Sequence, residues 1–188
     1  IGDAVRTFGG EAVMTSPGCA SGTDRVAEAA RDMSDVDVIV NVQGDEPELA
    51  GSAIDRVVEL LEEDPAAVMS TLATPIRSRE QLEDPACVKV VFDAGGRALY
   101  FSRSPIPHAR QWDPPSFYQH VGMYAYRREF LMRLAGLPPC RLEKIECLEQ
   151  LRVLDAGYAI RVAVVDAPTR GIDTPHDYQA FVERQQSR

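Results

Sequence analysis

The sequence predicts an α/β fold with a mixed, mainly parallel central sheet and an inserted β-rich segment. Through residue 71, short apolar runs alternate with stretches of helical character, which is typical of βα units. From residue 88 to 115 the pattern changes to strand-like runs around a glycine turn, followed by a proline-rich stretch. A chain of 188 residues suits one hydrophobic core, so we expect a single domain over residues 1–188.

The first half of the chain carries most of the predicted βα alternation. Residues 1–8 have helical character, and Gly9-Gly10 ends that helix. Because the chain begins inside this helix and without a methionine, we expect residues before Ile1 to be missing. The next predicted elements are a strand at 11–15, a helix at 21–33, a strand ending near Asp45, a helix at 52–62 and a strand at 67–71.

The second half begins with the inserted β-rich segment. Strands at 88–92 and 98–101 flank the turn 93–96, which predicts a hairpin. The remaining predicted elements are strands at 118–126 and 160–165 and helices at 127–134, 143–154 and 175–185.

Composition excludes several classes of function. The formal charge of −9 argues against a nucleic-acid surface, because such a surface needs clustered Lys and Arg. No apolar run approaches membrane-spanning length, so we expect no membrane partner. The four cysteines form no C-x-x-C pair and have no zinc-site spacing with the three histidines. Four cysteines could pair, but in a chain this large with a good core we expect free thiols in a reducing cytoplasm.

Two aspartates are candidate metal ligands because each follows a predicted strand. Asp45 ends the apolar run 37–42 at a polar corner, and Asp173 follows the last strand. In open α/β sheets ligands bind beyond the carboxyl ends of strands, and Mg²⁺ prefers carboxylate, phosphate and water oxygens. The alternative is that each aspartate begins a turn or caps the next helix.

Two other segments are suited to anionic or polar ligands. Ser21, Gly22 and Thr23 open a helix, where exposed backbone N–H groups can bind an anion or the polar edge of a base. Arg103 follows a strand and precedes a rigid proline loop, so its guanidinium can bind a carboxylate or phosphate bidentately. The alternatives are ordinary helix capping for the first segment and a surface salt bridge for Arg103.

A polar wall is predicted on one face of the strand 118–126. Alternation along a strand places His120, Gly122, Tyr124 and Tyr126 on the same face, where they could bind hydroxyl groups, with Gly122 leaving room for a ligand. A structural histidine and half-buried tyrosines are the alternative.

Two polar residues of the helix 143–154 complete the candidates. Glu149 and Gln150 lie beside an apolar stripe and could reach a cavity. The alternative, which is commoner for such residues, is that they are solvent-exposed on the helix surface.

Taken in order, these segments closely resemble the 3-deoxy-manno-octulosonate cytidylyltransferase (CMP-Kdo synthetase) family, essentially from end to end. The segments that carry the resemblance are Ser21-Gly22-Thr23-Asp24-Arg25, Asn41-Val42-Gln43-Gly44-Asp45-Glu46-Pro47, Tyr100-Phe101-Ser102-Arg103-Ser104-Pro105-Ile106-Pro107, His120-Val121-Gly122-Met123-Tyr124-Ala125-Tyr126-Arg127, Leu148-Glu149-Gln150-Leu151-Arg152 and Gly171-Ile172-Asp173-Thr174-Pro175.

The resemblance implies a Rossmann-like nucleotidyltransferase fold of the glycosyltransferase-A-like kind, and a cytoplasmic homodimer. It implies transfer of CMP from CTP to 3-deoxy-D-manno-octulosonate (Kdo), dependent on Mg²⁺, for lipopolysaccharide biosynthesis. The resemblance also implies roles for individual residues. These are Asp45 and Asp173 at the metal and in catalysis, Ser21, Gly22 and Thr23 at the nucleotide, and Gln43, Arg103, His120, Tyr124, Glu149 and Gln150 at the sugar.

One departure from the family pattern is specific. The family begins with a strand, a Pro-Ala-Arg loop and a Leu-Pro-Gly-Lys segment, whose Arg and Lys grip the triphosphate, and none of these is in the 188 residues. We therefore expect the first strand and the triphosphate loop to be missing and a sheet edge to be exposed. We expect the full-length protein to be the enzyme and the chain alone to have little or no activity.

Two other functions stay open. The first is a cytidylyltransferase for another acidic sugar, such as sialic acid or an amino-Kdo. The second is a non-catalytic module that binds a nucleotide sugar. A panel of sugars separates the first from the Kdo enzyme, and an upstream loop carrying Arg and Lys would exclude the second.

Overall fold

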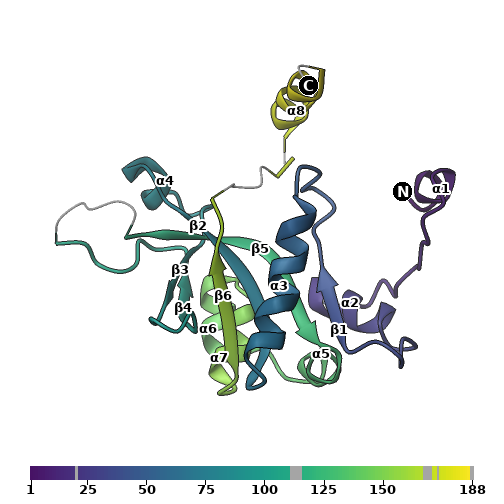
Figure 1. The fold of residues 1–188 in the computed structure, drawn as a ribbon, viewed down its shortest axis with the longest axis horizontal. Coiled ribbons are helices and arrows are strands. Elements are labelled where there is room, and N and C mark those ends of the chain that lie inside the picture. The colour runs from purple at the N-terminus through teal and green to yellow at the C-terminus, as the bar shows by residue number, and fades with distance from the viewer. Residues whose placement is uncertain (20, 111–115, 167–170, 173, 187–188) are drawn as a thin grey trace.

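The computed structural model describes residues 1–19, 21–110, 116–166, 171–172 and 174–186. Within them, one six-stranded sheet forms the centre of the molecule (Figure 1). Its strands are β1 (Val38–Asn41), β2 (Ala67–Pro75), β3 (Lys89–Phe92), β4 (Ala98–Ser102), β5 (Tyr118–Arg127) and β6 (Ala159–Val164). The strand order is β4-β3-β5-β2-β6, and the sixth strand, β1, also pairs with β5.

The predicted mixed sheet in an α/β fold is confirmed, but its neighbouring strands are not mainly parallel. Among the described pairs only β2 and β6 are parallel, whereas β5 is antiparallel to β1, β2 and β3. Strands β1, β2, β3 and β6 therefore share one direction. Because β5 runs the opposite way among them, most hydrogen-bonded neighbours are antiparallel.

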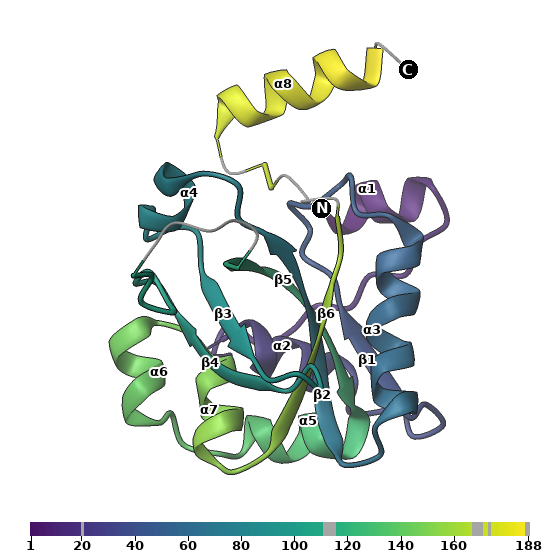
Figure 2. The same ribbon diagram turned by 60° about the vertical axis from the view of Figure 1, so that its left-hand side comes forward.

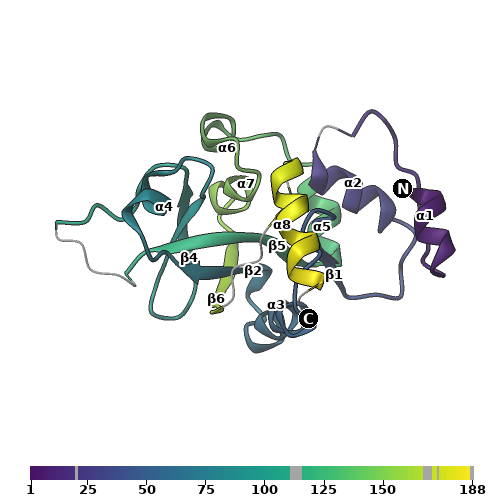
Figure 3. The same cartoon turned by 90° about the horizontal axis from the view of Figure 1, so that it is seen from above.

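Helices cover both faces of the sheet (Figures 2 and 3). On one face, α3 (Gly51–Glu63) buries Val57, Leu60 and Leu61, whose spacing of three and four residues forms one helical stripe. On the other face lie α2 (Gly22–Ala29), α5 (Arg128–Ala135), α6 (Arg141–Glu146) and α7 (Gln150–Asp155), which cover the larger core cluster. Each fully buried leucine or phenylalanine contributes about 1.5–3 kcal/mol, so these two layers hold the sheet in place.

Three helices lie at the periphery. They are α1 (Gly2–Thr7), α4 (Arg79–Glu83) and α8 (Pro175–Gln186). Helices α1 and α8 stand away from the sheet in Figure 1. Helix α8 is joined to the segment after β1 by an ion pair of 2.6 Å between Arg184 and Glu48. No helix within the described part of the chain is long and apolar enough to cross a membrane.

Several predicted elements need correction. Residues 11–15 are not a strand, and Val13 and Met14 are exposed because no neighbouring strand pairs with them in the described structure. The predicted helix 143–154 is two helices, α6 and α7, separated at Cys147, which adopts the left-handed conformation with φ of 53°. The helix that begins at Gly22 ends at Ala29 rather than near residue 33.

Candidate active site

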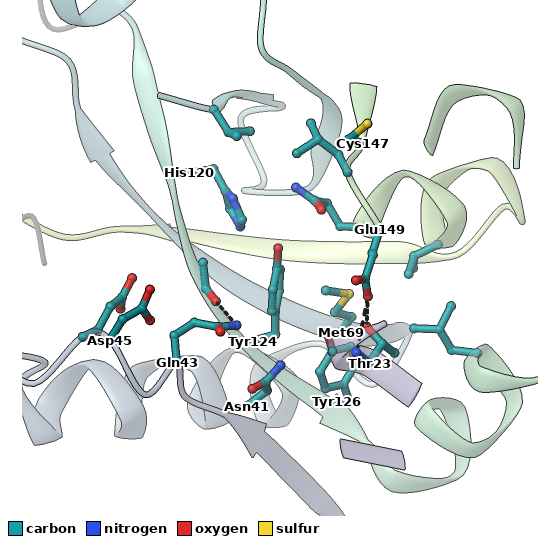
Figure 4. Close-up of a pocket in the computed structure, with 18 residues that line it drawn as sticks. Thr23, Asn41, Gln43, Asp45, Met69, His120, Tyr124, Tyr126, Cys147 and Glu149 are labelled. Atoms are coloured by element: carbon teal, nitrogen blue, oxygen red, sulfur yellow. Dashed lines mark hydrogen bonds between the residues drawn. The ribbon is translucent and has the colours of Figure 1, made fainter. Parts of the chain in front are cut away.

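A cavity of about 340 Å³ opens beside the carboxyl end of β1 and the polar face of β5 (Figure 4). Residues from several elements between Gly22 and Val153 line it. The predicted site residues at its wall are Gly22, Thr23, Gln43, Asp45, His120, Tyr124, Glu149 and Gln150. The sheet thus brings together most of the residues that the sequence singles out.

The four residues of the predicted polar wall on β5 lie at this cavity, whereas their binding of hydroxyl groups stays a prediction. His120, Gly122, Tyr124 and Tyr126 all line the cavity. The ring centroids of His120 and Tyr124 are 5.3 Å apart, and those of Tyr124 and Tyr126 are 5.9 Å apart. A Cβ added to Gly122 would meet nothing within 4 Å, so this position leaves open space between the aromatic rings. The wall presents hydroxyl groups and an imidazole to any ligand in the cavity.

Burial controls the protonation of this wall. Because His120 is only 8% exposed, loss of hydration lowers its pKa to about 3 and the ring is neutral at pH 7. Burial also raises the pKa of Tyr124 and of Tyr126, so both phenols keep their protons. At neutral pH the wall therefore offers uncharged donors and acceptors, which suit sugar hydroxyls better than ionic groups.

At one end of the cavity, α2 meets α7. The hydroxyl and the backbone N–H of Thr23 donate to Oε2 of Glu149, at 2.5 and 3.4 Å. A carboxylate is favourable at a helix N-terminus, where the backbone N–H groups lack partners within the helix. The Ser21 hydroxyl caps the same helix by accepting from the N–H of Asp24, as the capping alternative predicts, and Ser21 does not line the main cavity.

Amide side chains provide further polar groups at the wall. Gln150 is only 4% exposed, yet its Nε2 has no hydrogen-bond partner among the residues that the structure describes. A buried donor left unsatisfied costs about 1–3 kcal/mol, so a ligand in the cavity that accepts from it would recover this energy. Gln43 donates from Nε2 to the carbonyl of Gly122 at 3.4 Å, which joins the segment after β1 to the polar face of β5.

In Figure 4, Asp45 lies at the end of the cavity opposite Thr23 and Glu149. The carbonyl of Asp45 accepts from the N–H of Ile172 at 2.8 Å, so the segment ending at residue 172 runs beside it. Asp173, the other predicted metal ligand, lies outside the described residues. Within the described part of the chain, no three His, Cys, Asp or Glu side chains form a cluster that could hold a metal ion.

The cavity wall is acidic. Among the residues that the structure describes, its lining includes Asp45, Glu46 and Glu149 and contains no lysine or arginine. A phosphate or carboxylate group entering this cavity would be repelled unless a cation accompanied it. Carboxylate oxygens are the ligands that Mg²⁺ prefers, so the donor set fits a divalent cation.

Arg103 is not brought into the cavity wall. Its Nε donates to the carbonyl of Glu146 at 2.8 Å and its Nη1 to the carbonyl of Pro85 at 3.0 Å. Its own N–H donates to the Glu146 carboxylate. In this state Arg103 braces two backbone segments, and its predicted contact with a sugar carboxylate stays a prediction.

Some lining residues were not singled out as site residues from the sequence. They include Asn41, Glu46, Met69 and Cys147. The first two lie in the motif around Asp45, which is a usable signal. No local sequence pattern indicates that Met69 and Cys147 line a site, because their positions depend on the pairing of β2 and on the break between α6 and α7.

Comparisons with known proteins agree with this geometry. Residues 1–161 match the family model described as cytidylyltransferase. The 3-deoxy-manno-octulosonate cytidylyltransferase of Rhodopirellula baltica is 49% identical, over 98% of this chain and 77% of the relative. The enzyme of the same name from Syntrophobacter fumaroxidans is 51% identical, over 97% of this chain and 74% of the relative.

Solved structures give the same result. The chain superposes with a TM-score of 0.92 and 39% identity on a CMP:2-keto-3-deoxy-manno-octonic acid synthetase complexed with CTP, covering 98% of this chain and 76% of the other. A 4-diphosphocytidyl-2C-methyl-D-erythritol synthase from Anaerococcus prevotii, 12% identical with a TM-score of 0.60, shares the fold alone. The chain therefore belongs to the cytidylyltransferase family, among the 3-deoxy-manno-octulosonate cytidylyltransferases.

Proposed function

We propose that the protein transfers CMP from CTP to the anomeric hydroxyl of Kdo, giving CMP-Kdo and pyrophosphate for lipopolysaccharide biosynthesis. One observation carries the proposal. A single cavity joins the Gly22-Thr23 turn, the uncharged polar wall of β5 and the carboxylate of Asp45. These are a place for a nucleotide, a place for a sugar and a carboxylate that can hold a cation. Relatives 49–51% identical over nearly the whole chain carry the name of this activity.

The residues of the chain act by positioning. Gly22 and Thr23 lie at the start of α2, where backbone N–H groups can hold the polar edge of cytosine. Tyr124 and the neutral His120 offer hydrogen bonds to sugar hydroxyls, and Gln150 has a donor without a partner in the described part of the chain. Held in this way, the anomeric hydroxyl attacks the α-phosphorus and pyrophosphate leaves in line. Such a step needs alignment and neutralisation of charge more than an enzyme nucleophile.

Mg²⁺ is the cofactor we propose. Asp45 would hold it together with Asp173, and the carboxylates of Asp45, Glu46 and Glu149 at the cavity wall support the need for a cation. When bound, Mg²⁺ neutralises negative charge on the phosphate groups.

Arg103 remains our candidate for the Kdo carboxylate. The guanidinium of Arg103 donates to the carbonyl oxygens of Glu146 and Pro85, which do not neutralise its charge.

We also propose that the protein is a cytoplasmic homodimer. The family resemblance supports both the compartment and the dimer, and four free cysteines are consistent with a reducing compartment.

The test is pyrophosphate release by the full-length protein with CTP, Mg²⁺ and Kdo. Release should require all three components and should fall by orders of magnitude in Asp45→Asn. The matched control is Asp55→Asn, which changes an exposed aspartate on α3 and should leave the rate unchanged.

Other outcomes select between the remaining functions. Release with sialic acid or an amino-Kdo, but not with Kdo, would keep the reaction and overturn the substrate. Binding of CMP-Kdo without any release, by protein shown to be folded, would favour a non-catalytic binding module.

A further inference from the structure

A threonine outside the cavity lining contacts the polar wall of β5. Thr71 lies in the middle of β2 and is 0% exposed. Its hydroxyl lies 3.0 Å from Nε2 of His120, 3.0 Å from the carbonyl oxygen of Val121 and 2.7 Å from that of Met123. One buried hydroxyl therefore contacts three polar groups of the strand that lines the cavity.

An irregularity in strand pairing creates this arrangement. Thr71 pairs with Tyr124, whereas the next residue, Leu72, pairs with Val121. The register shift leaves Gly122 and Met123 as extra residues on β5, which is a β-bulge. The bulge turns the carbonyl oxygens of Val121 and Met123 toward the Thr71 hydroxyl. The ring of His120, on the same strand, contacts that hydroxyl through Nε2.

Proton counting assigns the direction of these hydrogen bonds. The Thr71 hydroxyl has one proton, and a carbonyl oxygen can only accept. The shortest of the three contacts joins the hydroxyl to the carbonyl oxygen of Met123, so the hydroxyl donates its proton to a carbonyl. The hydroxyl oxygen then accepts, and Nε2 of His120 is the group within reach to donate.

The neutral ring carries one proton on one of its two nitrogens. With the proton on Nε2, the second nitrogen, Nδ1, has a lone pair and can only accept. Edge-to-face packing against Phe101 at 5.1 Å and the Tyr124 ring at 5.3 Å hold the imidazole in place. A fixed ring with a defined acceptor can discriminate between sugar hydroxyl positions.

We propose that Thr71 is a positioning residue that holds His120 as the Nε2–H tautomer, so that Nδ1 accepts a hydrogen bond from a hydroxyl of the sugar. The part concerning the sugar rests on the proposed function, whereas the tautomer does not. Because Thr71 does not line the cavity, it acts on specificity through His120 without contacting the substrate.

The tautomer is measured by ¹⁵N NMR of the histidine rings at pH 7 in the absence of substrate. The chain has three histidines, and loss of one signal set in His120→Gln assigns His120. We expect a protonated Nε2 and a bare Nδ1 in the wild type. Thr71→Val should lose this preference, and Thr71→Ser, which keeps the hydroxyl, should restore it. A protonated Nδ1 in the wild type, or an unchanged tautomer in Thr71→Val, would overturn the proposal.

Kinetics supply the second readout. Thr71→Val should raise the KM for the sugar about tenfold, the equivalent of one hydrogen bond, and leave the KM for CTP unchanged. Thr74→Val is the matched control, because Thr74 is another buried threonine on β2 and should alter neither KM. Equal effects of Thr71→Val and Thr74→Val would show a general packing defect and would refute a specific role. A protein that fails to release pyrophosphate would still give the NMR result, so failure of the proposed function is distinguishable.

Discussion

Replacement of Arg152 by methionine tests how α6 and α7, the second of which lines the cavity, are held together. Arg152 and Glu143 are both 7% exposed and form a two-point ion pair, with Nε donating to Oε2 at 2.8 Å and Nη2 donating to Oε1. Arg152 also donates to the carbonyl of Leu137 at 3.2 Å. The pair joins α6 to α7 across the break at Cys147, and α7 carries Gln150 into the cavity.

The expected magnitude follows from this geometry. Removal of one partner leaves the other charge buried without compensation, which costs about 3–5 kcal/mol. Glu143 also accepts from the N–H of Cys140 in a capping box, and loss of a cap costs about 1 kcal/mol. The double variant Glu143→Leu/Arg152→Met should therefore lose only about 1–2 kcal/mol, much less than either single variant.

Urea unfolding followed by circular dichroism measures these changes. With a denaturant slope of about 2 kcal/mol/M, Arg152→Met should lower the midpoint by roughly 1.5–2.5 M. Arg56→Met is the control, because Arg56 pairs with Glu59 and Glu63 on the exposed side of α3 and such pairs contribute about 0–1 kcal/mol. A loss of less than 1 kcal/mol in Arg152→Met, or a double variant as unstable as the sum of the singles, would refute the reasoning.

Three further predictions concern buried polar groups and the open space of the cavity. Lys89→Met should cost about 2–4 kcal/mol in urea unfolding, because the fully buried ammonium donates to the carbonyls of Asp84, Cys87 and Arg103; an unchanged midpoint would contradict this. His120 has a pKa of about 3 when folded and 6.5 as a model value, so between these the unfolded state binds more protons and the free energy of unfolding falls as pH falls, by about 1.4 kcal/mol per unit. The free energy of unfolding is measured against pH for the wild type and for His120→Gln. The difference between the two slopes isolates this effect, and a difference of zero would disprove it. Gly122→Leu should keep the fold but raise the KM for the sugar, since a side chain there enters open space; an unchanged KM would show that the sugar does not reach Gly122.

Local patterns predicted the polar wall correctly. Alternation along 118–126 places every second side chain on one face, and the structure brings His120, Tyr124 and Tyr126 to the cavity as expected. The corner at Asp45 and the helix start at Gly22 were also recognisable, because strand ends and helix caps have local sequence signals.

Non-local contacts account for what the sequence did not predict. Nothing in residues 118–127 indicates that β5 lies between β1 and β2, so the antiparallel pairing was missed. Cys147 is neither glycine nor proline, and its left-handed conformation at the break depends on the packing of α6 and α7. Arg103 was suited to a carboxylate by its chemistry, but its guanidinium contacts depend on where the chain places the carbonyls of Pro85 and of Glu146, the last residue of α6.

The central claim is that nucleotide, sugar and metal meet in one cavity. A crystal structure of the full-length protein with CTP, Mg²⁺ and an unreactive Kdo analogue tests it most directly. We predict the metal at Asp45, cytosine beside Gly22 and Thr23, and the sugar against His120 and Tyr124. A sugar or nucleotide bound outside this cavity, or a metal that does not contact Asp45, would contradict the account.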